Sequence, residues 1–196
     1  MFDNEIFLSQ AKANVFHGQM NDSQTAGALS LVSAWFVKHA QEDTRWLAYA
    51  LATAYHEADF TMQPIDEVGH GAGHAYGVPD AVTGLAYYGR GYVQLTWKAN
   101  YATMGVKVGA DLVNHPELAL IPATAAAILF QGMIDGDFTG VGLRRYFNET
   151  ADDPMGARRI VNGTDRAAKV AAYHSGFLAA LLAAGATAPF YEPSLA

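Results

Sequence analysis

Cysteine is absent from this sequence, and charged residues make up only 16% of it. Without cysteine the chain can form neither disulfide bonds nor zinc sites with thiolate ligands, so its fold must depend on packing. The formal net charge is −7. Proteins that bind nucleic acid neutralise phosphates with Lys and Arg, so we expect no nucleic-acid partner. The same charge provides no attraction to an anionic cell envelope.

Long apolar segments are absent too. The most apolar stretch, Val170 to Gly185, is interrupted by His174 and Ser175 and is too short and too rich in alanine for a membrane span. The chain starts with the acidic segment MFDNE, whereas a secretory signal starts basic and continues into an apolar run. We therefore expect no membrane insertion and synthesis in the cytoplasm. A substrate outside the cell would then require release or export by other machinery.

The sequence does contain a regular helical pattern. At 196 residues, 51% of them hydrophobic, the chain fits one compact domain covering residues 1–196. We therefore expect a mainly α fold. Helix caps and apolar residues at helical spacing predict five helical segments: Asp22 to about His39, Glu42 to about Glu57, Pro122 to just before Gly136, Asp152 to Val161, and Asp165 to Ala184.

The middle of the chain interrupts this helical pattern. Seven glycines fall between Gly69 and Gly91, and no long helix can form there. Residues 92–97 alternate in a way that fits either a brief strand or a turn into a helix, so we expect at most a small β-hairpin. Long irregular segments inside compact domains usually carry function, which directs attention to this region.

The helix that ends near Tyr55-His56-Glu57 carries a candidate general acid. At about 100° per residue, Glu57 lies within about 20° of Trp46 and Ala50, which belong to the apolar face of that helix. An apolar setting and the negative end of a helix both favour the protonated carboxyl group that a general acid needs. The alternative is a glutamate that is capped by an arginine or exposed where the helix frays.

A second carboxyl group, that of Glu67, lies at the start of the glycine-rich segment. Loop backbone and water should keep it ionised there, and two carboxyl groups in unlike surroundings can divide the roles of acid and base. Asp66 competes with it for the role of base, and Asp59 is a weaker candidate. A plain solvated loop charge is the alternative interpretation of Glu67.

The residues that follow resemble a known family. The run YYGRGYVQLTW at 87–97, followed by Asn100 and Tyr101, is similar to the signature of family 19 glycoside hydrolases, which include chitinases and phage endolysins. His56-Glu57 resembles the motif with the family's general acid, and Glu67 lies ten residues on, where short-looped bacterial and phage members have their base. The segment RRIVNG at 158–163 resembles a late part of the cleft. The similarity extends over about residues 48–173, and the chain looks most like the muramidase-type prophage members.

This resemblance implies a lysozyme-like, two-lobed helical fold and an inverting mechanism. Inversion needs an acid at the leaving oxygen and a carboxylate that activates water on the opposite face, roughly 6.5–9.5 Å apart. By the resemblance, Glu57 is the acid, Glu67 is the base and Thr96 helps to orient the water. The residues expected to bind the sugar are His56, Gln94, Asn100 and Asn162.

Aromatic and basic side chains complete the expected site. Tyr88 and Trp97 are expected to offer flat faces to sugar rings, although a place in the core is the alternative for both. Arg90 is expected to be structural: it should pair with a carboxylate beneath the cleft, from where it could also tune the acid. Lys169, with Arg166 close by in sequence, stands where the family often has an arginine near the base.

A zinc-dependent peptidoglycan amidase or peptidase is an alternative, because His56, His70 and His74 lie close together in sequence. However, His56 lacks the second histidine four residues on that a zinc-peptidase helix needs, and the other two fall in a glycine-rich stretch. We therefore expect neither a metal nor a cofactor. A non-catalytic sugar-binding protein is a further alternative, although both candidate carboxylates are present.

Together these observations predict a peptidoglycan hydrolase of the endolysin type, which cuts β-1,4 bonds between N-acetylated amino sugars. A chitinase is the main alternative, because chitin contains the same linkage. Short loops without disulfides favour peptidoglycan, whose lactyl-peptide branches need space. We expect a monomer whose partner is the glycan strand and which reaches the wall by means of a phage holin or a secretion machine.

Overall fold

The structure is a computed structural model that describes residues 2–187. Two short strands, β1 (Ile65–Asp66) and β2 (Arg90–Gly91), pair antiparallel in this range. The α-helices are α1 (Asn4–Asn14), α2 (Asp22–Lys38), α3 (Thr44–Glu57), α4 (Lys98–Val108), α5 (Pro122–Asp135) and α6 (Ala167–Ala183). Shorter 3₁₀ helices are η1 (Ala75–Gly77), η2 (Pro116–Leu120), η3 (Leu143–Arg145) and η4 (Gly156–Ile160). The expected mainly α fold with a small hairpin is therefore confirmed.

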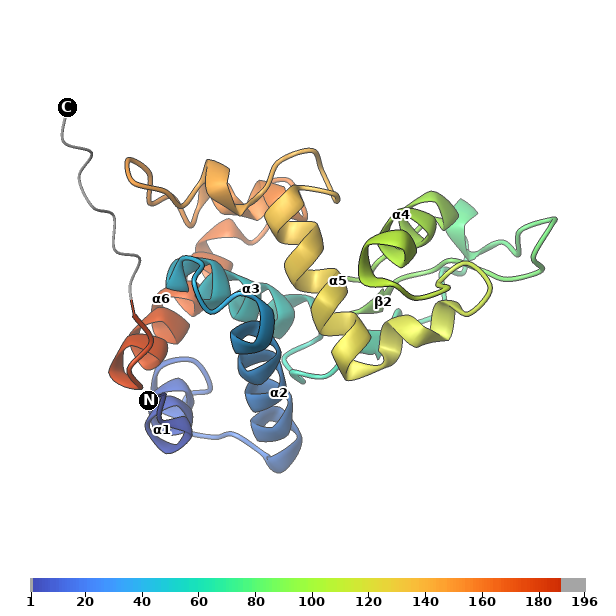
Figure 1. Cartoon of the computed structure of the whole chain (residues 1–196). Coiled ribbons are helices and arrows are strands. Elements are labelled where there is room, and N and C mark those ends of the chain that lie inside the picture. The colour runs from blue at the N-terminus through green and yellow to red at the C-terminus, as the bar shows by residue number, and fades with distance from the viewer. Residues whose placement is uncertain (1, 188–196) are drawn as a thin grey trace.

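The helices form two groups of unequal size (Figure 1). The larger group contains α1, α2, α3 and α6, while α4, the strand pair and the glycine-rich loops lie on the other side of α5. α5 packs against α2 and α3 in the larger group and against α4 in the smaller one. The described part of the chain thus has the two lobes that the resemblance implies. None of its helices combines the length and the hydropathy needed to cross a membrane.

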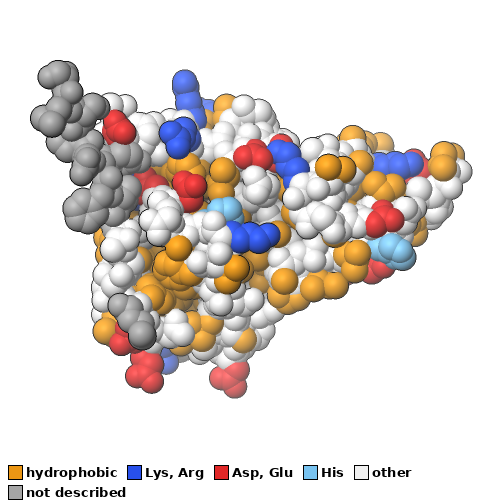
Figure 2. Space-filling model, in the orientation of Figure 1, with side chains coloured by type: hydrophobic (Ala, Val, Ile, Leu, Met, Phe, Trp, Pro, Cys, Tyr) orange, Lys and Arg blue, Asp and Glu red, His pale blue; other side chains and the backbone are white. Residues whose placement is uncertain are grey.

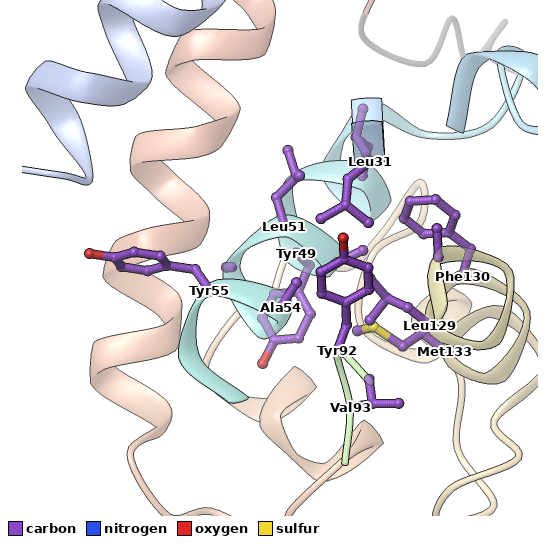
Figure 3. Packing of buried hydrophobic residues seen from close by; sticks show 14 of the residues in the cluster. Leu31, Tyr49, Leu51, Ala54, Tyr55, Tyr92, Val93, Leu129, Phe130 and Met133 are labelled. Atoms are coloured by element: carbon purple, nitrogen blue, oxygen red, sulfur yellow. The ribbon is translucent and has the colours of Figure 1, made fainter. Parts of the chain in front are cut away.

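α3 lies inside the larger lobe, and eleven of its 14 residues are buried. A helix that is apolar on most of its surface needs neighbours on most sides, and α2, α5 and α6 all pack against it. Tyr92, which follows β2, is buried beside Leu129 and Met133 of α5, with its ring directed towards α3 (Figure 3). This ring ties the segment after β2, and with it the smaller lobe, to the core.

The start of α2 agrees with the sequence. Asn21 and Gln24 exchange side-chain-to-backbone hydrogen bonds of 2.8 and 2.9 Å, and this capping box starts α2 at the predicted residue. The helix predicted for residues 152–161 is wrong in length, because only Gly156–Ile160 is helical and it is a 3₁₀ turn. Asp153 accepts a hydrogen bond from the Gly156 N–H at 2.7 Å, which favours a tight turn at that point.

Two helices, α1 and α4, are not among the predicted segments. α1 starts at a cap formed by Asp3, whose side chain accepts from two backbone N–H groups at 2.9 and 3.0 Å. Its buried residues Phe7 and Ala11 are four apart, which is the helical signal in this segment. α4 begins directly after Trp97, whose φ is 72°, and residues 92–94 before it form a turn. The alternating pattern of residues 92–97 therefore stops one residue before a helix begins.

The seven residues between α3 and β1, numbers 58–64, form a strained turn. Asp59, Phe60 and Met62 have φ values of 47°, 62° and 56°. Such values are costly for these residue types and persist only where the surroundings impose them. The start of α2 does so here, because the Gln24 side chain donates to the Phe60 carbonyl at 2.9 Å and Gly27 leaves room for the Met62 carbonyl. The turn fixes how the chain leaves α3 and enters β1.

Replacing Gly27 with alanine tests this contact. An added Cβ would lie 1.8 Å from the Met62 carbonyl oxygen, a backbone atom that cannot rotate away. Alanine normally stabilises a helix by about 1 kcal/mol relative to glycine, but we expect Gly27→Ala to lower the free energy of unfolding by about 2 kcal/mol. Urea denaturation measures the change. Ser33→Ala, at an exposed position of α2, is the control, and equal or higher stability of Gly27→Ala would contradict the contact.

A buried histidine, His174, lies on the face of α6 that packs towards α3. Its ring is 5.1 Å from that of Phe147 and 5.7 Å from that of Tyr49. Burial lowers the pKa of His174 from 6.5 to about 4, a shift that the Asp152 carboxylate opposes and the Arg45 guanidinium reinforces. The imidazole is therefore neutral in the folded protein near pH 7.

Because this imidazole is buried and neutral, we expect the free energy of unfolding to decrease in mild acid. Between pH 6.5 and about 4 the unfolded chain binds a proton at His174 that the folded protein does not bind. The contribution of His174 to the free energy of unfolding is therefore complete above pH 6.5 and decreases as the pH falls towards 4. The loss approaches about 3 kcal/mol, since one pKa unit corresponds to about 1.4 kcal/mol. We expect His174→Leu to show a smaller decrease in unfolding free energy than the native protein between pH 7 and pH 4.5, measured in urea. The exposed His115→Gln is the control, and an unchanged pH dependence in His174→Leu would refute this prediction.

Candidate active site

Glu57 is the last residue of α3, and its side chain is 16% exposed. Its Oε1 accepts a hydrogen bond from Nη1 of Arg158 at 2.5 Å. The Arg158 side chain extends from η4, is 2% exposed, and donates through Nε to the Asp165 carbonyl at 2.8 Å. The expectation considered only the apolar setting and the negative end of the helix as the surroundings of Glu57, and it needs correction. A buried guanidinium is its direct partner, as in the alternative of an arginine-capped glutamate.

His56 precedes this carboxyl group and is half-buried beside the rings of Phe60 and Tyr173. Burial lowers the pKa of His56, and the neighbouring Glu57 carboxylate opposes that shift. The imidazole is therefore neutral near pH 7, and its buried Nδ1 has no hydrogen-bond partner within residues 2–187. Its place next to the candidate acid is compatible with contact to substrate, and that role stays a prediction.

Glu67 directly follows β1 and is half-buried. Both of its carboxylate oxygens have donors: the Tyr76 hydroxyl donates to Oε1 at 2.9 Å, and the Gly89 N–H donates to Oε2 at 2.9 Å. The Glu67 N–H in turn donates to the Gly89 carbonyl at 2.7 Å. These bonds hold the carboxylate in one orientation, and each oxygen keeps the capacity to accept a further bond. A plain solvated loop charge would have no such fixed donors.

Gly89 is the point where the side chains of Glu67 and Gln94 meet. A Cβ added at Gly89 would lie 2.8 Å from Gln94 Oε1 and 3.2 Å from Glu67 Cβ, so there is room only for glycine. Nε2 of Gln94 donates to the carbonyls of Ile65 and Gly91 at 3.1 and 3.2 Å, which links β1 to the segment after β2. The amide nitrogen of Gln94 is thus used within the protein, and the bond to sugar that the resemblance implies would fall to Oε1.

Arg90 is buried and has the structural partners that we expected. Its Nε lies 3.4 Å from Oδ1 of Asp66, and its Nη1 donates to the Tyr101 hydroxyl at 3.0 Å. Asp66, the rival candidate for the base, is therefore engaged in an ion pair. Arg90 is not the cation beside the candidate acid, because Glu57 pairs with Arg158 instead.

Tyr88 has protein groups on both faces of its ring. The Arg90 guanidinium carbon lies 3.6 Å from the ring centroid, and the His70 ring is stacked at 4.7 Å with an interplanar angle of 17°. Two groups this close to the ring centre would overlap on one face, so they occupy opposite faces. The structure therefore does not give Tyr88 the free flat face that we expected. Trp97, by contrast, is 50% exposed, which places its indole outside the core and open to a sugar ring.

Thr96 and Asn100 lie at the start of α4. Thr96 is half-buried, and its carbonyl accepts a hydrogen bond from Nδ2 of Asn100 at 2.9 Å. Asn100 thus uses its amide nitrogen to close the first turn of the helix, which leaves Oδ1 for a substrate. Asn162 is exposed just after η4, and its N–H donates to the carbonyl of Arg158, the partner of Glu57, at 2.9 Å. The roles of these three side chains towards a sugar stay predictions.

Lys169 and Arg166 do not pair with Glu67 in the part of the chain that the structure describes. Lys169 is exposed on α6, and the Nε of Arg166 lies 3.9 Å from Oδ1 of Asp165. Because Arg158 contacts the carbonyl of that same aspartate, Arg166 belongs to the surroundings of the candidate acid and not to those of the base.

The two histidines of the glycine-rich segment take part in aromatic stacking. His70 stacks on Tyr88, and His74 stacks on Tyr76 with ring centroids 5.0 Å apart and an interplanar angle of 4°. Within residues 2–187, no group of three or more His, Cys, Asp or Glu side chains is placed to hold a metal ion. The described residues therefore provide no set of side chains for the zinc site of that alternative.

Two carboxylates thus occupy unlike surroundings on neighbouring elements. Glu57 ends a buried helix and contacts a buried cation, whereas Glu67 follows a short strand and accepts bonds from two neutral donors. The turn at 58–64, which is attached to α2, joins the two elements. Two carboxyl groups in unlike surroundings on a two-lobed helical scaffold fit the lysozyme-like class, in which one group donates a proton and the other activates water.

Comparison with known proteins gives the family. A family model described as "Chitinase class I", for glycoside hydrolase family 19, matches residues 1–138. This range contains both candidate carboxylates and the signature run at 87–97. The chain therefore belongs to family 19, as its sequence signature predicts. The late segment at 158–163 lies outside the matched range.

The curated relatives are considerably longer proteins. A basic endochitinase of Vitis vinifera is 43% identical over 131 residues, or 65% of this chain and 38% of that protein. Endochitinase CH25 of Brassica napus is 31% identical over 129 residues, or 64% of this chain and 39% of that protein. The chain thus spans well under half the length of these two relatives. A protein of Hevea brasiliensis named as an inactive chitinase-like protein is 45% identical over 51 residues, or 26% of this chain and 15% of that protein.

Solved structures share the fold. Chitinase C from Streptomyces griseus aligns over 95% of this chain and 78% of its own, with a TM-score of 0.59 and 23% identity. A bacterial family 19 chitinase aligns over 95% of this chain and 96% of its own, with a TM-score of 0.51 and 20% identity. At these identities the likeness establishes the fold alone.

Sequence reasoning gave no role to three groups that contact the two carboxylates: the Arg158 guanidinium, the Tyr76 hydroxyl and the Gly89 N–H. Arg158 had only a partial signal, because it lies beside Arg159 in the segment that resembles part of the cleft, and the sequence does not show which of the two arginines is buried. The other two had no such signal. Both depend on how the loop between β1 and β2 folds back.

The Glu57–Arg158 pair predicts a measurable energetic coupling. Removing one partner of a buried hydrogen bond to a charged group costs about 1.5–3 kcal/mol, and the Arg158 guanidinium makes this bond to Glu57 whether the carboxyl group is neutral or ionised. We expect Arg158→Gln to lower the free energy of unfolding by about that amount at pH 7. In a Glu57→Gln background the same replacement should cost less, because the carboxyl group that Arg158 contacts is absent. Equal losses in the two backgrounds, measured by urea denaturation, would show that the pair contributes nothing.

Proposed function

We propose that the protein hydrolyses β-1,4-glycosidic bonds between N-acetylated amino sugars, with inversion at the anomeric carbon. The observation that carries this proposal is the pair of carboxylates in unlike surroundings, Glu57 against buried Arg158 and Glu67 oriented by Tyr76 and Gly89. Membership of family 19 supports it. We assign Glu57 as the general acid and Glu67 as the general base.

The reaction balances with these two groups and one water molecule. Glu57 donates its proton to the glycosidic oxygen while the bond between that oxygen and the anomeric carbon breaks. Water, oriented by Thr96, attacks the anomeric carbon from the opposite face, and Glu67 accepts the proton that the water releases. The new hydroxyl group then has the inverted configuration. Exchange of one proton with solvent returns both carboxyl groups to their starting states.

Arg158 has a defined part in the proton donation. It contacts Oε1 of Glu57, which can accept this bond in the neutral carboxyl group as well as in the carboxylate. Oε2 is then left to carry the proton towards the sugar. As the proton departs, negative charge develops on Glu57, and a guanidinium already in place stabilises it without reorganisation.

We propose peptidoglycan as the substrate. The chain has no cysteine, so disulfides cannot hold extended loops around the site. Only seven residues separate α3 from β1. The alignment covers 78% of the Streptomyces chitinase, so part of that protein has no counterpart in this chain. Short loops support an open site in which the lactyl-peptide branches of alternate sugars can be placed. On this proposal the protein is made in the cytoplasm, is released by a phage holin or a secretion machine, and acts as a monomer.

The charge of this chain offers little long-range attraction to the wall. Lys, Arg, Asp and Glu side chains are scattered over the face shown in Figure 2, without a gathered basic patch. With a net charge of −7, long-range attraction to an anionic polymer is not expected. Direct contacts with the sugars, such as the half-exposed indole of Trp97 can provide, support binding on this proposal.

Chitin is the second candidate substrate, because the relatives and structures described above are named as chitinases. Mass spectrometry of the products from purified peptidoglycan and from chitin oligomers separates the two. Muramic acid at the new reducing end indicates a muramidase, whereas glucosamine there indicates glucosaminidase or chitinase-type cleavage. Release of fragments from chitin alone would overturn the peptidoglycan proposal.

Glu57→Gln tests the general acid. The replacement removes the proton donor but keeps the size of the side chain, so we expect turnover to fall by roughly 10²- to 10⁴-fold while the affinity for oligosaccharide is largely retained. Initial-rate assays and calorimetric titration measure the two effects. Glu149→Gln, at an exposed carboxyl group, should behave as the native protein. Full turnover in Glu57→Gln would refute the assignment, and it would leave the non-catalytic alternative open.

The assigned base and the stereochemistry have their own tests. Glu67→Ala should be inactive in water, and azide should restore cleavage as glycosyl azide, because azide attacks without a base to remove a proton. Proton NMR of the first products should show the inverted anomer. A retained anomer would contradict the inverting mechanism whatever the substrate.

A further inference from the structure

Tyr76 is the residue whose role is not accounted for so far. It lies in η1, within the glycine-rich loop that joins β1 to β2, and its hydroxyl donates to Oε1 of Glu67 at 2.9 Å. The two residues are nine positions apart, and the loop turns back so that the phenol reaches the carboxylate. The other oxygen of Glu67 is held by the Gly89 N–H at 2.9 Å. Tyr76 is thus the side-chain member of a pair of donors, one for each oxygen.

The loop behind Tyr76 is packed too closely to place the ring elsewhere. A Cβ added at Gly71 would lie 2.7 Å from Gly77 Cα and 3.0 Å from Tyr76 Cδ2. A Cβ added at Gly77 would lie 2.1 Å from the Gly71 carbonyl oxygen. The Tyr76 carbonyl also accepts a hydrogen bond from the Tyr87 N–H at 3.1 Å. The backbone of the loop therefore sets the direction of the phenol.

Two aromatic rings pack against the Tyr76 ring. The His74 ring stacks on it at 5.0 Å with an interplanar angle of 4°, and the Trp97 ring meets it edge-on at 5.3 Å and 80°. Trp97 is half-exposed. Tyr76 therefore stands between the carboxylate of Glu67 and an exposed indole of the signature segment.

We propose that Tyr76 is a positioning residue for the general base: its hydroxyl holds the Glu67 carboxylate in the orientation that receives a proton from the attacking water. This inference depends on the proposed function, because it assumes that Glu67 is the base. The hydrogen bond to Glu67 raises the pKa of the Tyr76 phenol above its usual value, so the hydroxyl remains a donor in mildly alkaline solution.

Tyr76→Phe tests the proposal, because it removes one oxygen and keeps the ring and its stacking. We expect kcat to fall about tenfold, as the loss of one hydrogen bond to a charged group implies, with KM changed by less than about twofold. A purely structural role would instead lower the thermal stability of the variant, or change KM as well as kcat.

Tyr92→Phe is the matched control. Its hydroxyl is buried and has no hydrogen-bond partner among the described residues, so the same atom is removed without loss of a contact. Turnover should equal that of the native protein. Thermal unfolding of both variants shows whether either replacement disturbs the fold.

Glu67→Ala separates failure of this inference from failure of the proposed function. If Glu67→Ala is inactive while Tyr76→Phe keeps native kcat, the positioning role of Tyr76 is refuted and the base assignment stands. If Glu67→Ala retains turnover, the base assignment is wrong and the inference falls with it. A fall in kcat with unchanged KM and unchanged thermal unfolding, in Tyr76→Phe and not in Tyr92→Phe, supports the proposal.

Discussion

The burial of α3 is the constraint on which the rest of this structure depends. Eleven of its 14 residues are buried, so the helix cannot move without disturbing α2, α5 and α6, all of which pack on it. At its last turn, His56 and Glu57 are half-buried. The strained turn that follows is attached to α2 through Gln24 and Gly27. A rigid core therefore determines where the chain leaves the helix and where β1, and with it Glu67, begins.

The two carboxylates differ in what stabilises them, and this difference is electrostatic. Glu57 contacts the full positive charge of a buried guanidinium, whereas Glu67 contacts a phenol and a backbone N–H. Charge-assisted bonds are stronger than neutral ones and stabilise a carboxylate as it forms. Glu57, which we assign as the proton donor, thus has the stronger stabilisation of developing negative charge. Glu67, which we assign as the base, has both carboxylate oxygens oriented by hydrogen bonds.

Much of the family signature acts within the protein. Gly89 makes room for Glu67 and Gln94, Arg90 pairs with Asp66, and Gln94 links the two strands through its amide nitrogen. Only Trp97 in this run presents a large exposed surface. The signature therefore describes mainly the packing that holds the loop around Glu67, and its residues shape the site by fixing backbone and carboxylate positions.

The sequence by itself determined the mainly α class, the helices α2, α3, α5 and α6, the family, and the two candidate carboxylates, because these depend on local periodicity and on contiguous motifs. It did not reveal the short 3₁₀ turn at 156–160 or α4 after the positive φ of Trp97, because local hydrogen bonds and backbone strain override the pattern there. Only the tertiary structure decided that Arg158 and not Arg90 faces Glu57, that both faces of Tyr88 are covered, and that Tyr76 reaches Glu67. Those contacts join segments that are distant in sequence or folded back through a glycine-rich loop, so their partners are chosen by packing and not by spacing along the chain.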